Sequence, residues 1–267
     1  MAVLRVTYMS QALRRPVPLE VILPADRLGP NGYLDPAGKK YKTLYLLHGL
    51  LGNEEGWLHN TRVALSAAQK GLAVVMPAGE NSFYIDADEP LLHRDFGSFI
   101  GEELPLITRR MFPLSETRED TYIGGLSMGG YGALRNGLKY ADTYSRIIVM
   151  SPAIHFFEQE DFRSVMGEEA VFGDLQKAKG TDRDPRWLVK QLKERKPEIF
   201  LCCGLQDGLL PASHSFRDFL EEEKYPFVYR EEEGIHDWFF WDKMLPKALD
   251  WLPLEEKKEG LHAGNVQ

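Results

Sequence analysis

The residues best suited to chemistry in this chain centre on Ser127. The stretch from Gly125 to Gly129 reads Gly-Leu-Ser-Met-Gly and matches the G-x-S-x-G pattern, in which a serine occupies a tight turn between a strand and a helix. The apolar run Thr121–Leu126 precedes this serine, and the helix-like segment Met128–Tyr140 follows it. Glycines two positions to either side remove side chains that such a turn cannot hold. The pattern predicts a nucleophilic serine, and the alternative is a serine that only caps the helix.

A serine hydroxyl needs a base, and the sequence offers His236 for that role. His236 follows the last apolar run, Phe227–Glu232, so we expect it in the loop at the carboxyl end of that strand. An acid that orients the imidazole should end the preceding strand, where Asp207 follows an apolar run and a glycine. Asp237 adjoins His236 and could hardly reach back to its ring. The sequence therefore predicts Ser127, Asp207 and His236 as a triad; the alternatives are a capping histidine and a turn aspartate.

Two backbone N–H groups should bind the negative charge that develops on a carbonyl oxygen during acyl transfer. Met128, directly after the nucleophile, supplies the first. The second is expected in the loop that ends the apolar run Thr43–His48, and we assign it to the N–H of Leu50. His48 itself is expected to orient this loop rather than to take part in catalysis.

Apolar runs that alternate with helix-like segments must position these residues. The runs lie at Thr43–His48, Leu72–Pro77, Thr121–Leu126, Ser145–Ser151, Glu198–Gly204 and Phe227–Glu232, and the helix-like segments at Trp57–Lys70, Phe99–Phe112, Met128–Tyr140, Ala212–Lys224 and Asp237–Leu252. This alternation predicts an α/β fold with a mostly parallel central sheet, helices on both faces, and ligands at the carboxyl ends of the strands. Two earlier runs, Val3–Met9 and Val17–Leu23, predict an antiparallel pair, and Pro16 and Pro18 favour an edge position for the second.

The alternation stops between Pro152 and Pro197, in a segment rich in aromatic residues. We expect residues 152–197 to form a small cap insertion over the site; the alternative is a satellite core of packed rings. The cap belongs to a single domain of residues 1–254, and the charged segment 255–267 is expected to be a flexible tail. The aromatic side chains expected to contact substrate are Trp57, Tyr84, Phe156 and Trp187.

The composition is that of a globular protein, with 43% hydrophobic and 27% charged residues and a net charge of −8. The acidic balance argues against nucleic-acid partners. No apolar window approaches the roughly 20 residues of a membrane span, and the N-terminal residues lack a signal-peptide pattern, so we expect a cytoplasmic protein without membrane association. The two cysteines, Cys202 and Cys203, are adjacent and support neither a disulfide framework nor a metal site.

The chain resembles the esterase D-like family of putative esterases, and most closely its bacterial tributyrin-esterase branch. The resemblance implies an α/β-hydrolase fold, hydrolysis of short acyl esters, and no metal or organic cofactor. It places the triad on Ser127, Asp207 and His236 and the oxyanion donors on Leu50 and Met128. The matching segments run in order along nearly the whole chain: Leu44–Gly52, Trp57, Val74–Pro77, Phe83-Tyr84, Glu102–Pro105, Gly124–Gly132, Val171–Asp174, Cys203–Asp207 and His236–Trp241.

Several activities remain open within this resemblance. The leading hypothesis is a serine carboxylesterase that cleaves small-molecule esters through an acyl-enzyme; a homo-oligomer is also possible. A thioesterase, an acyl transferase or an S-formylglutathione hydrolase-like enzyme would use the same triad. Many formylglutathione hydrolases carry a cysteine pattern near the His-Gly loop, which is absent here because Leu51 and Gly52 follow Leu50. A non-catalytic binding protein on a hydrolase scaffold is disfavoured, since all three triad candidates are present.

Overall fold

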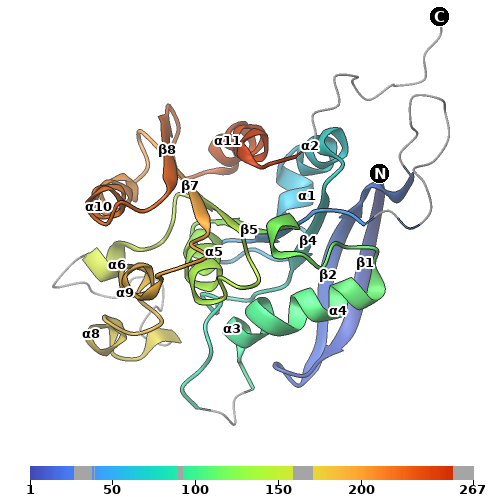
Figure 1. Ribbon diagram of the computed structural model, residues 1–267, viewed down its shortest axis with the longest axis horizontal. Helices are drawn as coiled ribbons and strands as arrows, with labels where there is room; N and C mark the ends of the chain where they lie inside the picture. Colours follow the sequence, from blue (N-terminus) through green and yellow to red (C-terminus); the bar gives the residue numbers. More distant parts are fainter. Residues whose placement is uncertain (27–37, 39, 90–92, 159–170, 255–267) are drawn as a thin grey trace, which may run out of the picture.

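An eight-stranded sheet runs through the molecule in the order β1-β2-β4-β3-β5-β6-β7-β8 (Figure 1). It is seen in a computed structural model that describes residues 1–26, 38, 40–89, 93–158 and 171–254. β1 pairs antiparallel with β2, β2 pairs antiparallel with β4, and the remaining pairs are parallel. The strands are β1 (Ala2–Ser10), β2 (Arg15–Leu23), β3 (Thr43–Leu47), β4 (Ala73–Pro77), β5 (Thr121–Leu126), β6 (Arg146–Met150), β7 (Glu198–Gly204) and β8 (Phe227–Glu232). The predicted tail, residues 255–267, lies outside the described residues.

Helices cover both faces of the sheet, which explains why its central strands are apolar along their whole length (Figure 1). On β3, Leu44 and Leu46 pack with α1, α2 and α11, whereas Tyr45 and Leu47 pack with the helices of the opposite face. The helices are α1 (Gly56–Asn60), α2 (Val63–Lys70), α3 (Phe96–Ser98), α4 (Leu104–Met111), α5 (Met128–Lys139), α6 (His155–Glu158), α8 (Leu175–Ala178), α9 (Pro185–Gln191), α10 (Leu210–Glu222) and α11 (Trp238–Trp251). The predicted α/β fold, with a mostly parallel central sheet and helices on both faces, is confirmed.

The local differences from the predicted elements have physical causes. The helix expected over Trp57–Lys70 is two helices, because the chain extends at Thr61 between α1 and α2. The prediction that Pro16 and Pro18 place their strand at the sheet edge is wrong: β2 lies between β1 and β4. Both prolines are tolerated because β4 pairs with β2 only from Leu19 onward, so no neighbour on that side needs their missing N–H groups.

The segment between β6 and β7 is anchored to the body of the fold by two adjacent residues. Asp182 accepts hydrogen bonds from Arg135 and Lys139 of α5, each at 2.5 Å. The guanidinium of Arg183 pairs with the carboxylate of Asp88, in the loop after β4. These contacts hold the residues just before α9 against the body of the fold. Asp182 contacts α5, the helix that begins directly after Ser127. Among the described residues, no helix is both long enough and apolar enough to cross a membrane.

Candidate active site

Ser127, His236 and Asp207 form one continuous chain of hydrogen bonds. They follow the carboxyl ends of β5, β8 and β7, which meet at the same edge of the sheet. His236 Nε2 lies 3.0 Å from Ser127 Oγ, and His236 Nδ1 lies 2.9 Å and 3.1 Å from the two carboxylate oxygens of Asp207. A carboxylate only accepts, so Nδ1 carries the proton and Nε2 is left free to accept one from the serine. The fold thus brings together the three residues that the sequence singled out.

Ser127 has φ 54° and ψ −120°, a strained conformation for a residue with a side chain. Tight packing around the turn enforces it. A Cβ on Gly129 would lie 2.5 Å from the carbonyl oxygens of both Leu47 and His48, and a Cβ on Gly125 would collide with the backbone of Gly129. The two glycines are therefore required by backbone contacts with each other and with the loop after β3, rather than by contact with the serine itself.

Replacing Gly129 with alanine is expected to lower both stability and turnover. The added methyl group would displace backbone atoms, which costs about 1–3 kcal/mol in a packed core, and it would push the loop after β3 away from Ser127. Urea unfolding and kcat for p-nitrophenyl acetate measure the two effects. The matched control is Gly208→Ala, because a Cβ on Gly208 meets no atom within 4 Å. A Gly129→Ala protein with the stability and kcat of the parent would contradict this packing argument.

Asp207 is held as a buried carboxylate. Its side chain is fully buried and accepts a hydrogen bond from the N–H of Leu209 at 2.9 Å, besides those of His236. Burial raises the pKa of Asp207, but the hydrogen bonds from His236 and Leu209 outweigh it, so the pKa lies below its ordinary value. Asp237, the neighbouring carboxylate, instead caps α11 by accepting from the N–H of Phe240. Of these two carboxylates, Asp207 is thus the one that is hydrogen-bonded to the His236 imidazole.

The start of α5 and the loop after β3 each present one candidate oxyanion donor. Met128 is the first residue of α5, so its N–H has no partner within the helix. Within the described part of the chain, neither that N–H nor the N–H of Leu50 has an acceptor. A Cβ on Gly49 would lie 3.4 Å from Ser127 Cβ, which shows how closely this loop approaches the nucleophile. Both N–H groups therefore remain available for a ligand at the serine.

Three side chains hold the loop after β3 in place through hydrogen bonds to backbone groups. His48 Nε2 accepts the N–H of Gly79 at 2.9 Å, so its proton is on Nδ1, which donates to Gly49 O at 2.8 Å. Burial lowers the pKa of His48, which keeps the ring neutral in this arrangement. Tyr84 Oη donates to His48 O at 3.0 Å, and Trp57 Nε1 donates to Leu47 O at 3.0 Å. His48 occupies the orienting position that the sequence analysis gave it.

Three of the four aromatic residues expected to contact substrate are buried in the core. Trp57, Tyr84 and Phe156 are at most 1% exposed and belong to the core. The first two spend their polar atoms on the backbone of the loop after β3, and Phe156 packs among the rings of Phe83, Tyr131, Phe157 and Phe172. Trp187, on α9, is partly buried against the same core. Trp57, Tyr84 and Phe156 therefore present almost no surface to a substrate, whereas a contact of Trp187 with substrate stays a prediction.

Three apolar residues close to the triad in the sequence are exposed, and the sequence analysis assigned no role to two of them, Leu51 and Phe239. Leu51, Ile235 and Phe239 are 81%, 54% and 87% exposed. Leu51 follows the candidate donor Leu50, Ile235 precedes His236, and Phe239 lies in the first turn of α11. The N–H of Leu51 donates to Asn81 Oδ1 at 2.8 Å, with φ 61°. Their positions next to predicted site residues are the one signal in the sequence that could have marked them.

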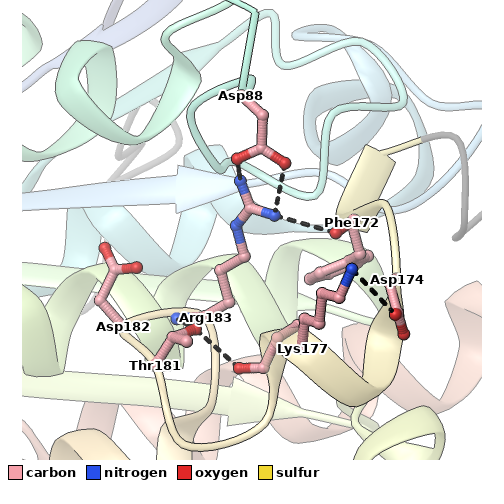
Figure 2. A pocket seen from close by; sticks show the side chains of 8 residues that line it. Asp88, Phe172, Asp174, Lys177, Thr181, Asp182 and Arg183 are labelled. Carbon is pink, nitrogen blue, oxygen red and sulfur yellow. Dashed lines mark hydrogen bonds and ion pairs between the residues drawn. The ribbon is translucent and has the colours of Figure 1, made fainter.

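A polar cavity of about 460 Å³ lies apart from these residues, between the loop after β4 and the segment around α8 (Figure 2). Figure 2 shows the Arg183 guanidinium pointing at the carboxylate of Asp88, and Lys177 pairs with Asp174 at 3.6 Å. The Arg183–Asp88 pair connects the segment around α8 with the loop after β4, and Asp182 pairs with Arg135 and Lys139 outside the lining. Its lining consists of Asp88, Phe172, Asp174, Lys177, Ala178, Thr181, Asp182 and Arg183. Over the described ranges, no three His, Cys, Asp or Glu side chains are arranged to hold a metal ion.

Comparison with known proteins places this geometry in a family. A family model described as "Putative esterase" matches residues 10–252. The chain is 40% identical over 263 residues to the acetyl esterase of Caldicellulosiruptor saccharolyticus, over 94% of this chain and 98% of that protein. It is 28% identical over 241 residues to the S-formylglutathione hydrolase of Bos taurus, over 78% of this chain and 82% of that protein.

The solved structures agree with this result. The S-formylglutathione hydrolase of Staphylococcus aureus matches with a TM-score of 0.81 at 31% identity, over 94% of this chain and 98% of that chain. A fluorophosphonate-binding serine hydrolase of the same organism, solved with substrate bound, matches with the same TM-score of 0.81 and the same 31% identity. The chain therefore belongs to the putative esterase family, and it is a serine esterase of the α/β-hydrolase fold.

Proposed function

We propose that Ser127 is the nucleophile, His236 the base and Asp207 its orienting acid in the hydrolysis of short-chain acyl esters. The observation that carries this proposal is the continuous hydrogen-bonded chain from Ser127 Oγ to the Asp207 carboxylate, next to the free N–H groups of Leu50 and Met128. The hydrogen-bonded chain makes a weak nucleophile reactive, and the two N–H groups can bind the negative charge that develops on the carbonyl oxygen.

The reaction proceeds in two halves. His236 Nε2 takes the serine proton as Ser127 Oγ attacks the ester carbonyl, and the N–H groups of Leu50 and Met128 bind the oxyanion. The tetrahedral intermediate collapses, the imidazolium gives its proton to the leaving alkoxide, and an acyl-enzyme remains on Ser127. Water, deprotonated by His236, then attacks the acyl carbonyl and releases the carboxylic acid. Asp207 stays ionised throughout and stabilises the imidazolium.

The preference for short acyl groups rests on the rings that fill the space beside α5. Tyr131 lies one turn after Ser127, and its N–H donates to Ser127 O at 3.0 Å. Around it pack Phe156, Phe157 and Phe172, with ring centroids 5.4–6.1 Å from that of Tyr131. Closely packed rings leave little room for a long acyl chain. We propose that residues 152–197 act as a cap that limits the site, and the 40% identical acetyl esterase supports a small acyl group.

Acetyl to butyryl esters are expected to be the best substrates, and chains of about eight carbons or more poor ones. A closed slot rejects extra methylenes by overlap, whereas an open groove would gain about 0.8 kcal/mol from burying each. The test measures kcat and KM across p-nitrophenyl esters of increasing acyl length. If kcat/KM instead keeps rising past eight carbons, by about tenfold for every two methylenes, the site is an open, lipase-like groove and this proposal is wrong.

A thioester is the second candidate substrate, because the Staphylococcus aureus S-formylglutathione hydrolase is 31% identical over 94% of this chain. Thioesters and oxygen esters share the acyl-enzyme and differ only in the leaving group. S-formylglutathione, measured beside acetyl, feruloyl and butyryl esters at matched concentrations, separates the two. We expect the oxygen esters to give the higher kcat/KM, and the reverse order would favour the second candidate.

The pH dependence of kcat/KM is expected to show an acid limb. Protonated His236 cannot accept the serine proton, so kcat/KM should fall as the pH of the assay is lowered from about 8 to about 5. Asp207 does not interfere, because hydrogen bonds outweigh burial and keep the pKa of its carboxyl below the ordinary value. Initial rates at substrate concentrations well below KM measure the profile. A profile that stays flat over this range would rule out a histidine base.

A further inference from the structure

The loop after β3 contains a strained turn that includes the candidate donor Leu50. The N–H of Gly52 donates to Gly49 O at 3.2 Å, which closes a four-residue turn over residues 49–52. Leu51, the third residue of this turn, has φ 61°. A type II turn requires a positive φ at its third position, where glycine or asparagine is usual. A leucine is strained there, and such strain persists only where the surrounding structure enforces it.

The side chain of Asn81 enforces this form of the turn. Its Oδ1 accepts the N–H of Leu51 at 2.8 Å. In a type I turn over the same four residues, the third residue would have a negative φ and the peptide between Leu50 and Leu51 would be turned over. The N–H of Leu51 would then point away from Asn81. The hydrogen bond to Asn81 therefore selects the strained form and fixes the peptide that follows the Leu50 N–H.

The loop after β4 holds Asn81 in place to make this contact. Glu80, the preceding residue, pairs with Arg15 of β2 and with Arg94, the latter at 2.8 Å. Glu80 also has φ 49°, a second strained conformation for a residue other than glycine. Ion pairs on both sides of Glu80 thus anchor the backbone from which the Asn81 side chain projects.

The loop after β4 therefore holds the turn on both sides of the Leu50 N–H. The N–H of Gly79 donates to His48 Nε2 at 2.9 Å, and this buried contact fixes the chain just before the turn. The contact between Leu51 and Asn81 fixes the chain just after the donor, and both of these residues are exposed. The donor thus lies between two hydrogen bonds that come from the same neighbouring loop.

We propose that Asn81 is a positioning residue that keeps the Leu50 N–H aimed at the oxyanion. The inference rests on the proposed function, because it assumes that Leu50 supplies one of the two donors. A donor stabilises the transition state fully only when its N–H already points at the place where the charge develops. Without the Asn81 side chain, the turn can relax to the form with a negative φ at Leu51. That change loosens the backbone next to the donor and leaves the triad intact.

Asn81→Ala is expected to lower kcat/KM for p-nitrophenyl acetate about tenfold, less than the roughly 10²- to 10³-fold that loss of a whole oxyanion donor costs. Butylboronic acid gives a second readout. Ser127 Oγ bonds to its boron as the serine proton passes to His236 Nε2, and a boron hydroxyl then takes the place of the oxyanion. Its inhibition constant should rise by about the factor by which kcat/KM falls. Circular dichroism should show the parental fold, because the Asn81 side chain is exposed.

Leu51→Gly separates this role from a direct contact between Asn81 and substrate. Glycine adopts a positive φ without strain, so the turn should keep its form with or without the Asn81 side chain. We therefore expect Asn81→Ala to lower kcat/KM by no more than about twofold in the Leu51→Gly background. A tenfold loss that persists in that background would show that Asn81 acts on the substrate itself, and the inference would be wrong.

Asn53→Ala is the matched control. Asn53 is another exposed asparagine of the loop after β3, and its Oδ1 also accepts a backbone N–H, that of Glu55, at 3.1 Å. This variant should keep the parental kcat/KM within about twofold. An equal loss in Asn53→Ala, or parental values of kcat/KM and of the inhibition constant in Asn81→Ala, overturns the inference and leaves the triad untouched. A Ser127→Ala protein with near-parental activity would instead overturn the proposed function.

Discussion

Ser127→Ala is expected to lower kcat for ester hydrolysis by about 10³-fold or more. The substitution removes the atom that forms the acyl-enzyme, and neither His236 nor the N–H groups of Leu50 and Met128 can replace it. The fold should persist, because the alanine Cβ occupies the place of the serine Cβ and the backbone strain at φ 54° is unchanged. Steady-state rates with p-nitrophenyl acetate and circular dichroism on the same sample measure the two effects.

The control for Ser127→Ala is Ser145→Ala. Ser145 immediately precedes β6, at the edge of the sheet opposite to the triad, and its hydroxyl makes only long contacts of 3.3 Å and 3.4 Å. It should keep the parental kcat within about twofold. A folded Ser127→Ala protein that hydrolyses esters at a near-parental rate would show that the nucleophile lies elsewhere.

Asp207→Asn is expected to lower kcat by about 10²- to 10⁴-fold. Asparagine has nearly the same shape, but its NH₂ group facing Nδ1 favours the tautomer that carries its proton on Nε2. That tautomer cannot accept the serine proton, and the imidazolium also loses its counter-charge. KM should change little, because Asp207 is buried beneath the histidine and does not meet substrate. Full kcat and KM determinations at a fixed pH separate these two parameters.

Asp237→Asn is the matched control for this substitution. Asp237 adjoins His236 in the sequence, but its carboxylate caps α11 and accepts from Phe240 N at 2.9 Å. Asparagine is also a good N-cap, so both stability and kcat should stay close to those of the parent. A crippled Asp237→Asn enzyme beside an active Asp207→Asn enzyme would reverse the assignment of the acid.

The fold and the triad could be predicted because both depend on order along the chain. Each triad residue follows a strand, and parallel strands bring their carboxyl ends to one edge, so the pattern around Ser127, Asp207 and His236 carries three-dimensional information. The G-x-S-x-G motif also predicts that side chains in place of its two glycines would clash. The structure shows that they would clash with the backbone of the motif and of the loop after β3. No such rule assigns the direction of a side chain outside a motif.

The directions of the aromatic side chains near the site could not be predicted for this reason. Trp57 and Tyr84 were expected at the site because their segments lie near it, yet their polar atoms turn inward to bind backbone carbonyls. Phe239, 87% exposed, lies in the segment Asp237–Leu252 that was expected to be a helix, and nothing in that pattern indicates its exposure. Sequence separation hides such contacts, because tertiary packing alone creates them.

Detection of the acyl-enzyme is the most direct test of the central claim that Ser127 forms a covalent intermediate. The parent enzyme is mixed with p-nitrophenyl acetate, quenched in acid within the first turnover, and digested for peptide mass spectrometry. We expect a burst of p-nitrophenol close to one equivalent per active site, and a single acetyl group on the peptide that contains Ser127. The Ser127→Ala protein should show neither signal. Acetylation of a different residue, or turnover with no burst and no acetylated peptide, would contradict the account.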